Sequence, residues 1–253
     1  MQSTKMKKWL LPNLVVAALL TATPTWAVGL LVNVTVVDRQ TDKELPVYVH
    51  NNEFWVAGQP GAKYGVLLKN RSNARVLTVL SVDGVNAVTG ETAGSQQSGY
   101  VLDRGTRTQV NGWRKSEDEI ATFEFTAPDA SYASRTGRPE HMGVIGVAIF
   151  KEKHPVPVVP NSMKRQYEST AQFEAAAADL APGLGTGHGE RERDAVSYTE
   201  FERASTHPTE VVRIRYDTPA NLRARGIRIR TIQPPVGPNP FPRDAGFVPD
   251  PPT

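Results

Sequence analysis

The glycine-rich run over residues 183–192 holds the side chains that could most readily do chemistry. His188 stands between two glycines, and Glu190 and Glu192 follow it closely. An imidazole beside carboxylates can form an acid–base pair or supply metal ligands. However, the run contains one histidine and matches no zinc-helix spacing, so a tight glycine loop with solvated charges explains it better. We therefore keep these three residues as weak catalytic candidates and expect neither a metal site nor a cofactor.

A second candidate is a binding surface made of arginines at alternating positions. One segment, residues 212–216, contains Arg213 and Arg215. The other, residues 227–230, contains Arg228 and Arg230. In both segments arginine alternates with apolar residues. If both segments are neighbouring strands, the four guanidinium groups gather on one face, which suits carboxylate or phosphate groups. The connection over residues 218–225 is shorter than the roughly 10 to 12 residues that a parallel crossover needs. The alternative is a solvated face neutralised by Glu190, Glu192, Glu200 and Glu202.

Other functional patterns have simpler explanations. Asp83 precedes Gly84, and an Asp-Gly hairpin turn explains this pair better than a calcium loop, which needs more oxygen ligands in register. Trp113 and the pair Phe54 and Trp55 could stack on sugars, although at strand spacing such residues more often cover the edge of a core. No Gly-x-Ser-x-Gly string of a serine hydrolase occurs.

The N-terminus has the pattern of a secretory signal peptide. Three lysines at positions 5, 7 and 8 precede an apolar run over residues 9–20, and the small residues Thr25 and Ala27 follow. We expect cleavage after Ala27, which leaves no transmembrane segment; the alternative is an N-terminal membrane anchor. The predicted location is the bacterial periplasm or the cell exterior.

Charge and cysteine content narrow the class of protein further. The 253-residue chain has a formal charge of +3. The three leader lysines account for all of it, so the mature chain is neutral and we expect no nucleic-acid partner. The absence of cysteine excludes disulfides, thiolate metal sites and a lipid-anchored cysteine.

Alternation of apolar and polar residues predicts short strands between about 30 and 151, separated by glycine turns. The expected fold is a mainly β, antiparallel β-sandwich, jelly-roll or immunoglobulin-like, over residues 28–152. A proline-rich linker over 153–168 follows, and then a small α+β segment over 169–232. That segment contains a helix over 169–180 and a short helix capped by Asp217 or Thr218. A proline-rich tail over 233–253 contains two further contact candidates, Phe241 and Phe247.

Several strings along residues 75–230 occur together: Ser81-Val-Asp-Gly-Val-Asn86, Ser98-Gly-Tyr-Val-Leu102, Gly112-Trp-Arg114, Gly143-Val-Ile-Gly-Val-Ala148 and Gly185-Thr-Gly-His-Gly-Glu-Arg-Glu192. They resemble an uncharacterised family of exported bacterial proteins. The resemblance implies that the sandwich and the Gly-His run belong to one recurring unit. It implies no substrate, cofactor or catalytic residue.

These patterns together predict a non-enzymatic binding or structural protein of the bacterial envelope. Its contact surfaces would be the arginine face and the tail. Its partner would be an envelope protein or the anionic groups of a glycan or phosphate. The alternative is a hydrolase or metal-dependent enzyme centred on His188 with Glu190 and Glu192.

Overall fold

A computed structural model describes residues 28–153 and 183–229. The expected leader, the linker from residue 154, the helix over 169–180, Arg230 and the tail with Phe241 and Phe247 lie outside the described residues. Among the described helices, none has the length and apolar content needed to cross a membrane.

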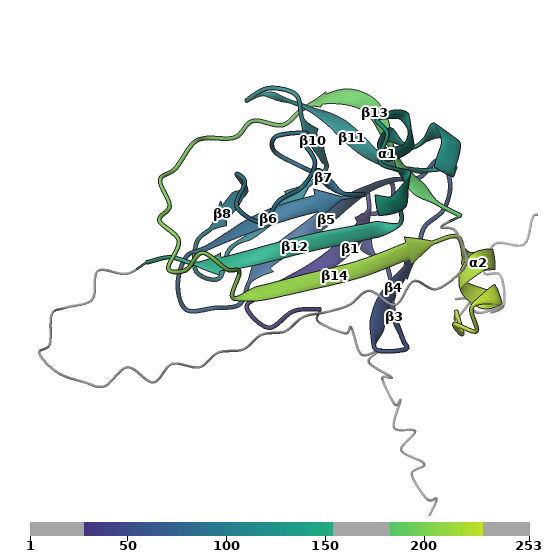
Figure 1. The fold of residues 1–253 in the computed structure, drawn as a ribbon, viewed down its shortest axis with the longest axis horizontal. Helices are drawn as coiled ribbons and strands as arrows, with labels where there is room; N and C mark the ends of the chain where they lie inside the picture. The colour runs from purple at the N-terminus through teal and green to yellow at the C-terminus, as the bar shows by residue number, and fades with distance from the viewer. Residues whose placement is uncertain (1–27, 154–182, 230–253) are drawn as a thin grey trace, which may run out of the picture.

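The described chain folds into two facing sheets (Figure 1). In sheet A every pairing is antiparallel. Its strands are β1 (Val32–Asp38), β2 (Lys43–Glu44), β5 (Lys63–Asn70), β9 (Arg107–Val110), β10 (Gly112–Arg114), β11 (Glu119–Thr126) and β13 (Gly185–Arg193). β13 pairs with β11, β11 pairs with β10 and β5, and β5 continues to β1. The glycine-rich run is therefore a strand of sheet A that pairs with β11.

Sheet B has the order β3-β4-β14-β12-β6-β7, with β8 also paired to β6. Its strands are β3 (Val47–His50), β4 (Glu53–Ala57), β6 (Val76–Val82), β7 (Val85–Asn86), β8 (Tyr100–Leu102), β12 (Val144–Lys151) and β14 (Glu210–Asp217). β14 runs parallel to β4 and antiparallel to β12. The C-terminal part of the chain thus supplies an inner strand of the sandwich.

The core lies between the sheets and follows the alternation seen in the sequence. Several strands place every second residue in this core, as in Val32, Val34 and Val36 of β1 and Ile145, Val147 and Ile149 of β12. β14 buries Val212, Ile214 and Tyr216 in the same way. The predicted mainly β sandwich with a small helical part is confirmed.

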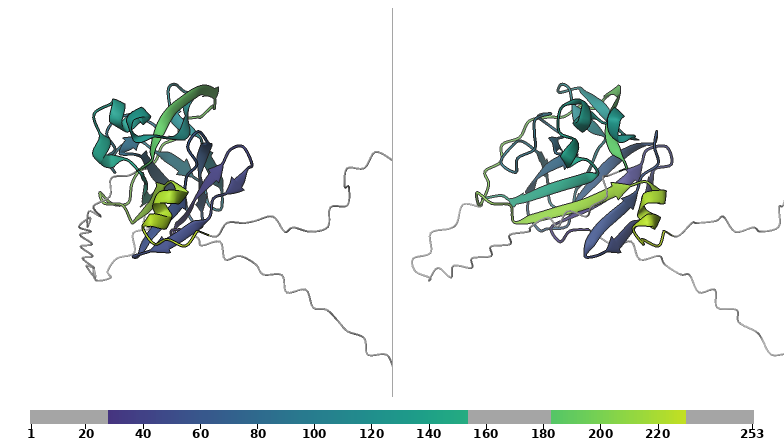
Figure 2. Two further views of the ribbon diagram at one scale, coloured as in Figure 1. Left: turned by 90° about the vertical axis from the view of Figure 1, so that its right-hand side faces the viewer. Right: turned by 45° about the vertical axis from the view of Figure 1, so that its right-hand side comes forward.

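Short helices close the ends of the sandwich. Two 3-10 turns, Pro128–Ala130 and Pro139–His141, flank α1 (Tyr132–Arg135) beside β13, and α2 (Pro219–Ala224) follows β14. Figure 2 shows α1 and β13 at one end of the molecule and α2 at the other. The predicted cap of α2 is present, because the Thr218 side chain accepts a hydrogen bond from the Asn221 amide, and Gly226 ends the helix with φ +82°.

Two local predictions are wrong. The run around His188 is not a tight loop, because residues 185–193 form β13 and none of its glycines has a positive φ. Gly185 and Gly189 are needed for close packing: a Cβ at these positions would lie 2.6 Å from Ser131 Cβ and 2.3 Å from Thr122 Oγ1. In addition, residues 227–229 form no strand.

Candidate binding surface

The outer face of sheet B is built from the residues that alternate with the core positions. On β12 these are Val144, Gly146 and Ala148; on β14 they are Arg215, Arg213 and Val211, which lie opposite them in the same order. Strand pairing alone therefore places two arginines beside a row of small apolar residues.

Along β6 this face is covered by an extended segment, residues 194–209, which we call the strap. Phe201 of the strap packs on a cluster formed by Leu77, Val79 and Phe150. The guanidinium of Arg203 lies 4.9 Å from the Phe150 ring centroid and donates a hydrogen bond to the Gln97 carbonyl. The strap thus buries this side of the sheet with apolar contacts and a cation–π contact.

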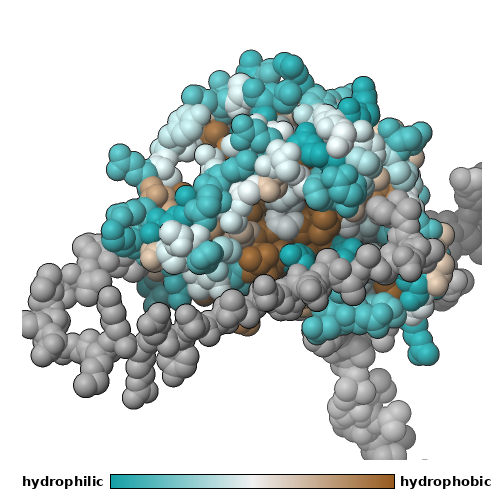
Figure 3. Space-filling view, viewed as in Figure 1, coloured by the Kyte–Doolittle hydropathy of each residue, from teal (hydrophilic) through white to brown (hydrophobic). Residues whose placement is uncertain are grey.

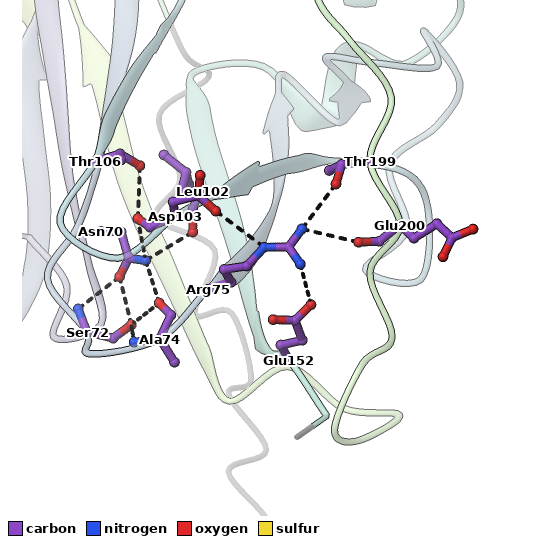
Figure 4. A network of polar contacts seen from close by, with 10 residues as sticks. All are labelled: Asn70, Ser72, Ala74, Arg75, Leu102, Asp103, Thr106, Glu152, Thr199 and Glu200. Atoms are coloured by element: carbon purple, nitrogen blue, oxygen red, sulfur yellow. Dashed lines mark hydrogen bonds and ion pairs between the residues drawn. The ribbon is translucent and has the colours of Figure 1, made fainter. Parts of the chain in front are cut away.

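Arg75 holds the strap to the sandwich (Figure 4). Its guanidinium lies 2.6 Å from the Glu152 carboxylate and 3.3 Å from that of Asp103, and it donates to Thr199 Oγ1 and the Glu200 carbonyl. Beside it, the buried Asn70 amide donates to the carbonyls of Ala74, Leu102 and Asp103. A shallow depression of about 540 Å³ lies here, lined by Arg75, Glu152 and three strap residues. These polar groups already bind one another, which indicates a structural role.

Along β4 the same face is covered by α2 and the residues after it. Leu222 and Ile227 pack on Trp55, and the guanidinium groups of Arg215 and Arg225 lie 5.6 and 5.3 Å from the Trp55 ring centroid. Trp55 is only 6% exposed, so it serves as a packing residue and not as an open platform for a sugar.

β14, α2 and the residues after α2 carry five arginines, which we call the arginine cluster: Arg213, Arg215, Arg223, Arg225 and Arg228. Arg215 forms a 2.7 Å ion pair with Glu53, and Arg225 lies 3.7 Å from Asp217. Arg213, Arg223 and Arg228 are exposed and form no ion pair with any described residue. The cluster therefore holds more positive charge than the described carboxylates near it can balance.

The cluster differs from the patch expected from sequence. Arg213 and Arg215 lie together on β14, but Arg228 lies across β4, in a shallow groove of about 420 Å³ beside β3, and Arg230 is outside the described residues. α2 contributes Arg223, and the residue that caps its C-terminal end is Arg225; the strand pattern missed both. The four glutamates proposed to neutralise the patch lie elsewhere: Glu190 and Glu192 bind Lys63, Glu202 binds Lys153, and Glu200 lines the depression beside Arg75.

His188 lies on β13 at the end of an aromatic row. Its ring centroid is 5.6 Å from that of Tyr132, which contacts Trp113, which in turn packs edge-on against Phe123. Partial burial, together with the charges of Lys115 and Arg191, keeps the pKa of the imidazole below its ordinary value.

Glu190 and Glu192 point away from this row into an ion-pair group. Lys63 Nζ lies 2.8 Å from Glu190 and 3.4 Å from Glu192, and Arg39 donates to Glu192 at 2.7 Å. Arg39 and Lys63 hold the pKa of Glu192 below its usual range. Within residues 28–153 and 183–229, no three His, Asp or Glu side chains are arranged to hold a metal ion.

Asp83 is a buried titratable residue whose environment the sequence did not reveal. The Asp-Gly turn is present, with φ of 50° at Asp83 and 71° at Gly84. The carboxylate, however, is fully buried and accepts hydrogen bonds from the amides of Gly143 and Thr186 and from the Tyr216 hydroxyl. Burial raises its pKa to about 6, despite these hydrogen bonds. The group is sealed inside the protein, so it supports the fold and offers no access to a substrate.

Comparison with known proteins found no match: no family model, no curated protein and no solved structure is similar to this chain.

Proposed function

We propose that the protein is an exported, non-enzymatic binding or structural protein of the bacterial envelope, and that the arginine cluster binds carboxylate or phosphate groups of an envelope partner. The observation that carries the proposal is the charge imbalance at the corner formed by β14, β4 and α2. Three exposed arginines there have no described acidic partner, while Glu53 and Asp217 engage the other two. Guanidinium groups bind planar or tetrahedral anions through paired hydrogen bonds.

Rigid packing supports this assignment. The guanidinium groups of Arg215 and Arg225 lie 5.6 and 5.3 Å from the ring centroid of the buried Trp55 and lie beside the carboxylates of Glu53 and Asp217. Arg215 and Arg225, held in this way, lose less entropy when a ligand binds than arginines on a free loop would, and Arg213, Arg223 and Arg228 supply the charge without a described ion-pair partner.

Export is supported by the predicted leader and by the residue that follows its cleavage point. Val28 is fully buried and pairs with Val34 through an isolated bridge. Cleavage after Ala27 would thus leave a chain whose first residue belongs to the sandwich. N-terminal sequencing of the protein from an envelope extract should begin at Val28; an intact Met1 on all molecules would contradict it.

Binding can be tested with the full chain and two soluble anionic polymers, polyphosphate and polyglutamate. The variant combining Arg213→Gln, Arg223→Gln and Arg228→Gln should weaken binding at least tenfold and reduce its dependence on salt. A matched control removes three charges from exposed positions of sheet A and its turn, with Lys69→Gln, Arg104→Gln and Arg107→Gln.

Equal loss in both triple variants would mean that only net charge matters and would refute a site at the cluster. Unchanged binding in the first variant would do the same. A preference for one polymer identifies the anion class.

We do not propose the hydrolase or metal enzyme, because the described contacts of His188, Glu190 and Glu192 join them to different partners.

A further inference from the structure

Between its two covered parts, the outer face of sheet B has an uncovered strip. We define it by Val144, Gly146 and Ala148 of β12 and Val211 of β14, with Arg213 at its border. Val211 is 55% exposed, and the three β12 residues are partly exposed. Figure 3 shows apolar residues gathered in the middle of this face, between hydrophilic surroundings.

The strip leaves room for side chains of another segment above Gly146. A Cβ at Gly146 would meet only Ser81 Cβ, at 3.8 Å, so the space above the central residue is open. Val79, beside Ala148 on β6, is already buried under the strap, and Trp55, beside Arg215 on β4, is buried under α2. The protein therefore covers both neighbouring strips with its own later segments and leaves this one to another occupant.

Chain connectivity indicates which segment that is. Lys153 lies just past the end of β12 at Lys151, next to the strap residue Glu202. Gly183 lies against Asp217 and Asn221, at the end of β14 that adjoins the start of β12. The intervening residues 154–182 thus leave one end of the strip and return at the other, a distance of about 26 Å for an eight-residue strand.

We infer that the strip is the docking surface for residues 169–180 of the same chain. The sequence predicts a helix there, about 18 Å long, which fits within the strip. Phe173, Ala177 and Leu180 share one face of that helix, and four consecutive alanines, 175–178, permit a close approach to the sheet. The prolines that follow Lys153 in the sequence favour an extended connection.

This inference does not depend on anion binding and can be tested by disulfide trapping, because the chain has no cysteine of its own. The test variant combines Ala148→Cys with Ala177→Cys. The matched control combines Ala148→Cys with Ala175→Cys, which lies on the opposite face of the predicted helix. Under mild oxidation, the test variant should form an intramolecular disulfide at least tenfold faster than the control.

Equal rates in the two variants would overturn the proposal. So would rapid maleimide labelling of Ala148→Cys alone at the rate of an open surface thiol, because the strip would then be free for an outside partner. Disulfide-linked dimers of that single variant would indicate a second copy as the occupant and would also overturn it.

A second measurement does not require a disulfide. Phe173→Asp should expose residues 154–182 to protease at least fivefold more than Glu174→Gln does, while the melting of the sandwich remains cooperative. Equal cleavage of the two variants would contradict docking through Phe173. Polymer binding measured on the same variants shows separately whether the arginine cluster is active.

Discussion

The Tyr216 hydroxyl donates a 2.5 Å hydrogen bond to the buried carboxylate of Asp83, which joins the last strand of sheet B to the β6–β7 turn. The same carboxylate accepts from the Gly143 amide at 2.9 Å and from the Thr186 amide at 2.7 Å. One side chain therefore connects β12, β13 and β14, three segments distant in sequence. Removing it should loosen all of them together.

The pKa of Asp83 predicts a specific dependence of stability on pH. Burial raises it from 3.8 to about 6 in the folded state, so the folded protein binds this proton more tightly than the unfolded chain. The resulting stabilisation, about 3 kcal/mol, is fully present below pH 3.8 and is lost as the pH rises through about 6.

The free energy of unfolding, measured by urea denaturation from pH 4 to pH 7, should show this component in the wild type and lose it in Asp83→Asn. Asp129→Asn, at an exposed position, is the control; equal pH profiles in wild type and Asp83→Asn would contradict the prediction.

Thr186 should contribute to stability through its hydroxyl. The Thr186 hydroxyl lies 2.6 Å from the hydroxyls of both Tyr64 and Tyr216, and all three groups are buried. Thr186→Val keeps the shape but leaves the tyrosine hydroxyls with one partner fewer, so unfolding should become about 1 to 3 kcal/mol easier. The exposed Thr209→Val should change the free energy of unfolding by less than about 0.5 kcal/mol. Similar values for the two variants would show that the network adds nothing.

The glycines of β13 should differ sharply in their tolerance of a side chain. A Cβ at Gly185 would lie 2.6 Å from Ser131 Cβ, whereas at Gly187 the nearest atom is the Thr126 methyl at 3.2 Å. Gly185→Ala should therefore destabilise the protein by about 2 kcal/mol, and Gly187→Ala by less than about 1 kcal/mol. Thermal melting of both variants tests this, and a larger loss at Gly187 would reverse the packing argument.

Arg75 should control how firmly the strap is attached. Arg75→Gln removes the ion pairs with Glu152 and Asp103 and weakens the contacts to the strap backbone. We expect about 1 kcal/mol of destabilisation and faster protease cleavage within residues 194–209. The exposed Arg71→Gln should match the wild type. If cleavage in the strap is unchanged by Arg75→Gln, Phe201 and Arg203 are sufficient to hold it.

The alternating strands could be predicted because the pattern lies within each strand: Val32, Val34 and Val36 alternate with polar or less buried positions and mark the face of β1 that packs in the core. The cap at Thr218 is equally local. β13 was missed because its glycines carry no alternation. Asp83 was missed because its partners lie 60, 103 and 133 residues away in sequence, and no short pattern contains that relation.

The position of β14 has a consequence for folding. β14 lies between β4 and β12, and it pairs Ile214 with both Phe54 and Ile145, residues far earlier in the chain. The β3–β4 hairpin and the β12-β6-β7 part of sheet B can join only when this strand arrives, so assembly of the sheet depends on contacts of high sequence separation and should be slow. If the chain is exported as proposed above, sheet B would remain incomplete until residues 210–217 had crossed the membrane.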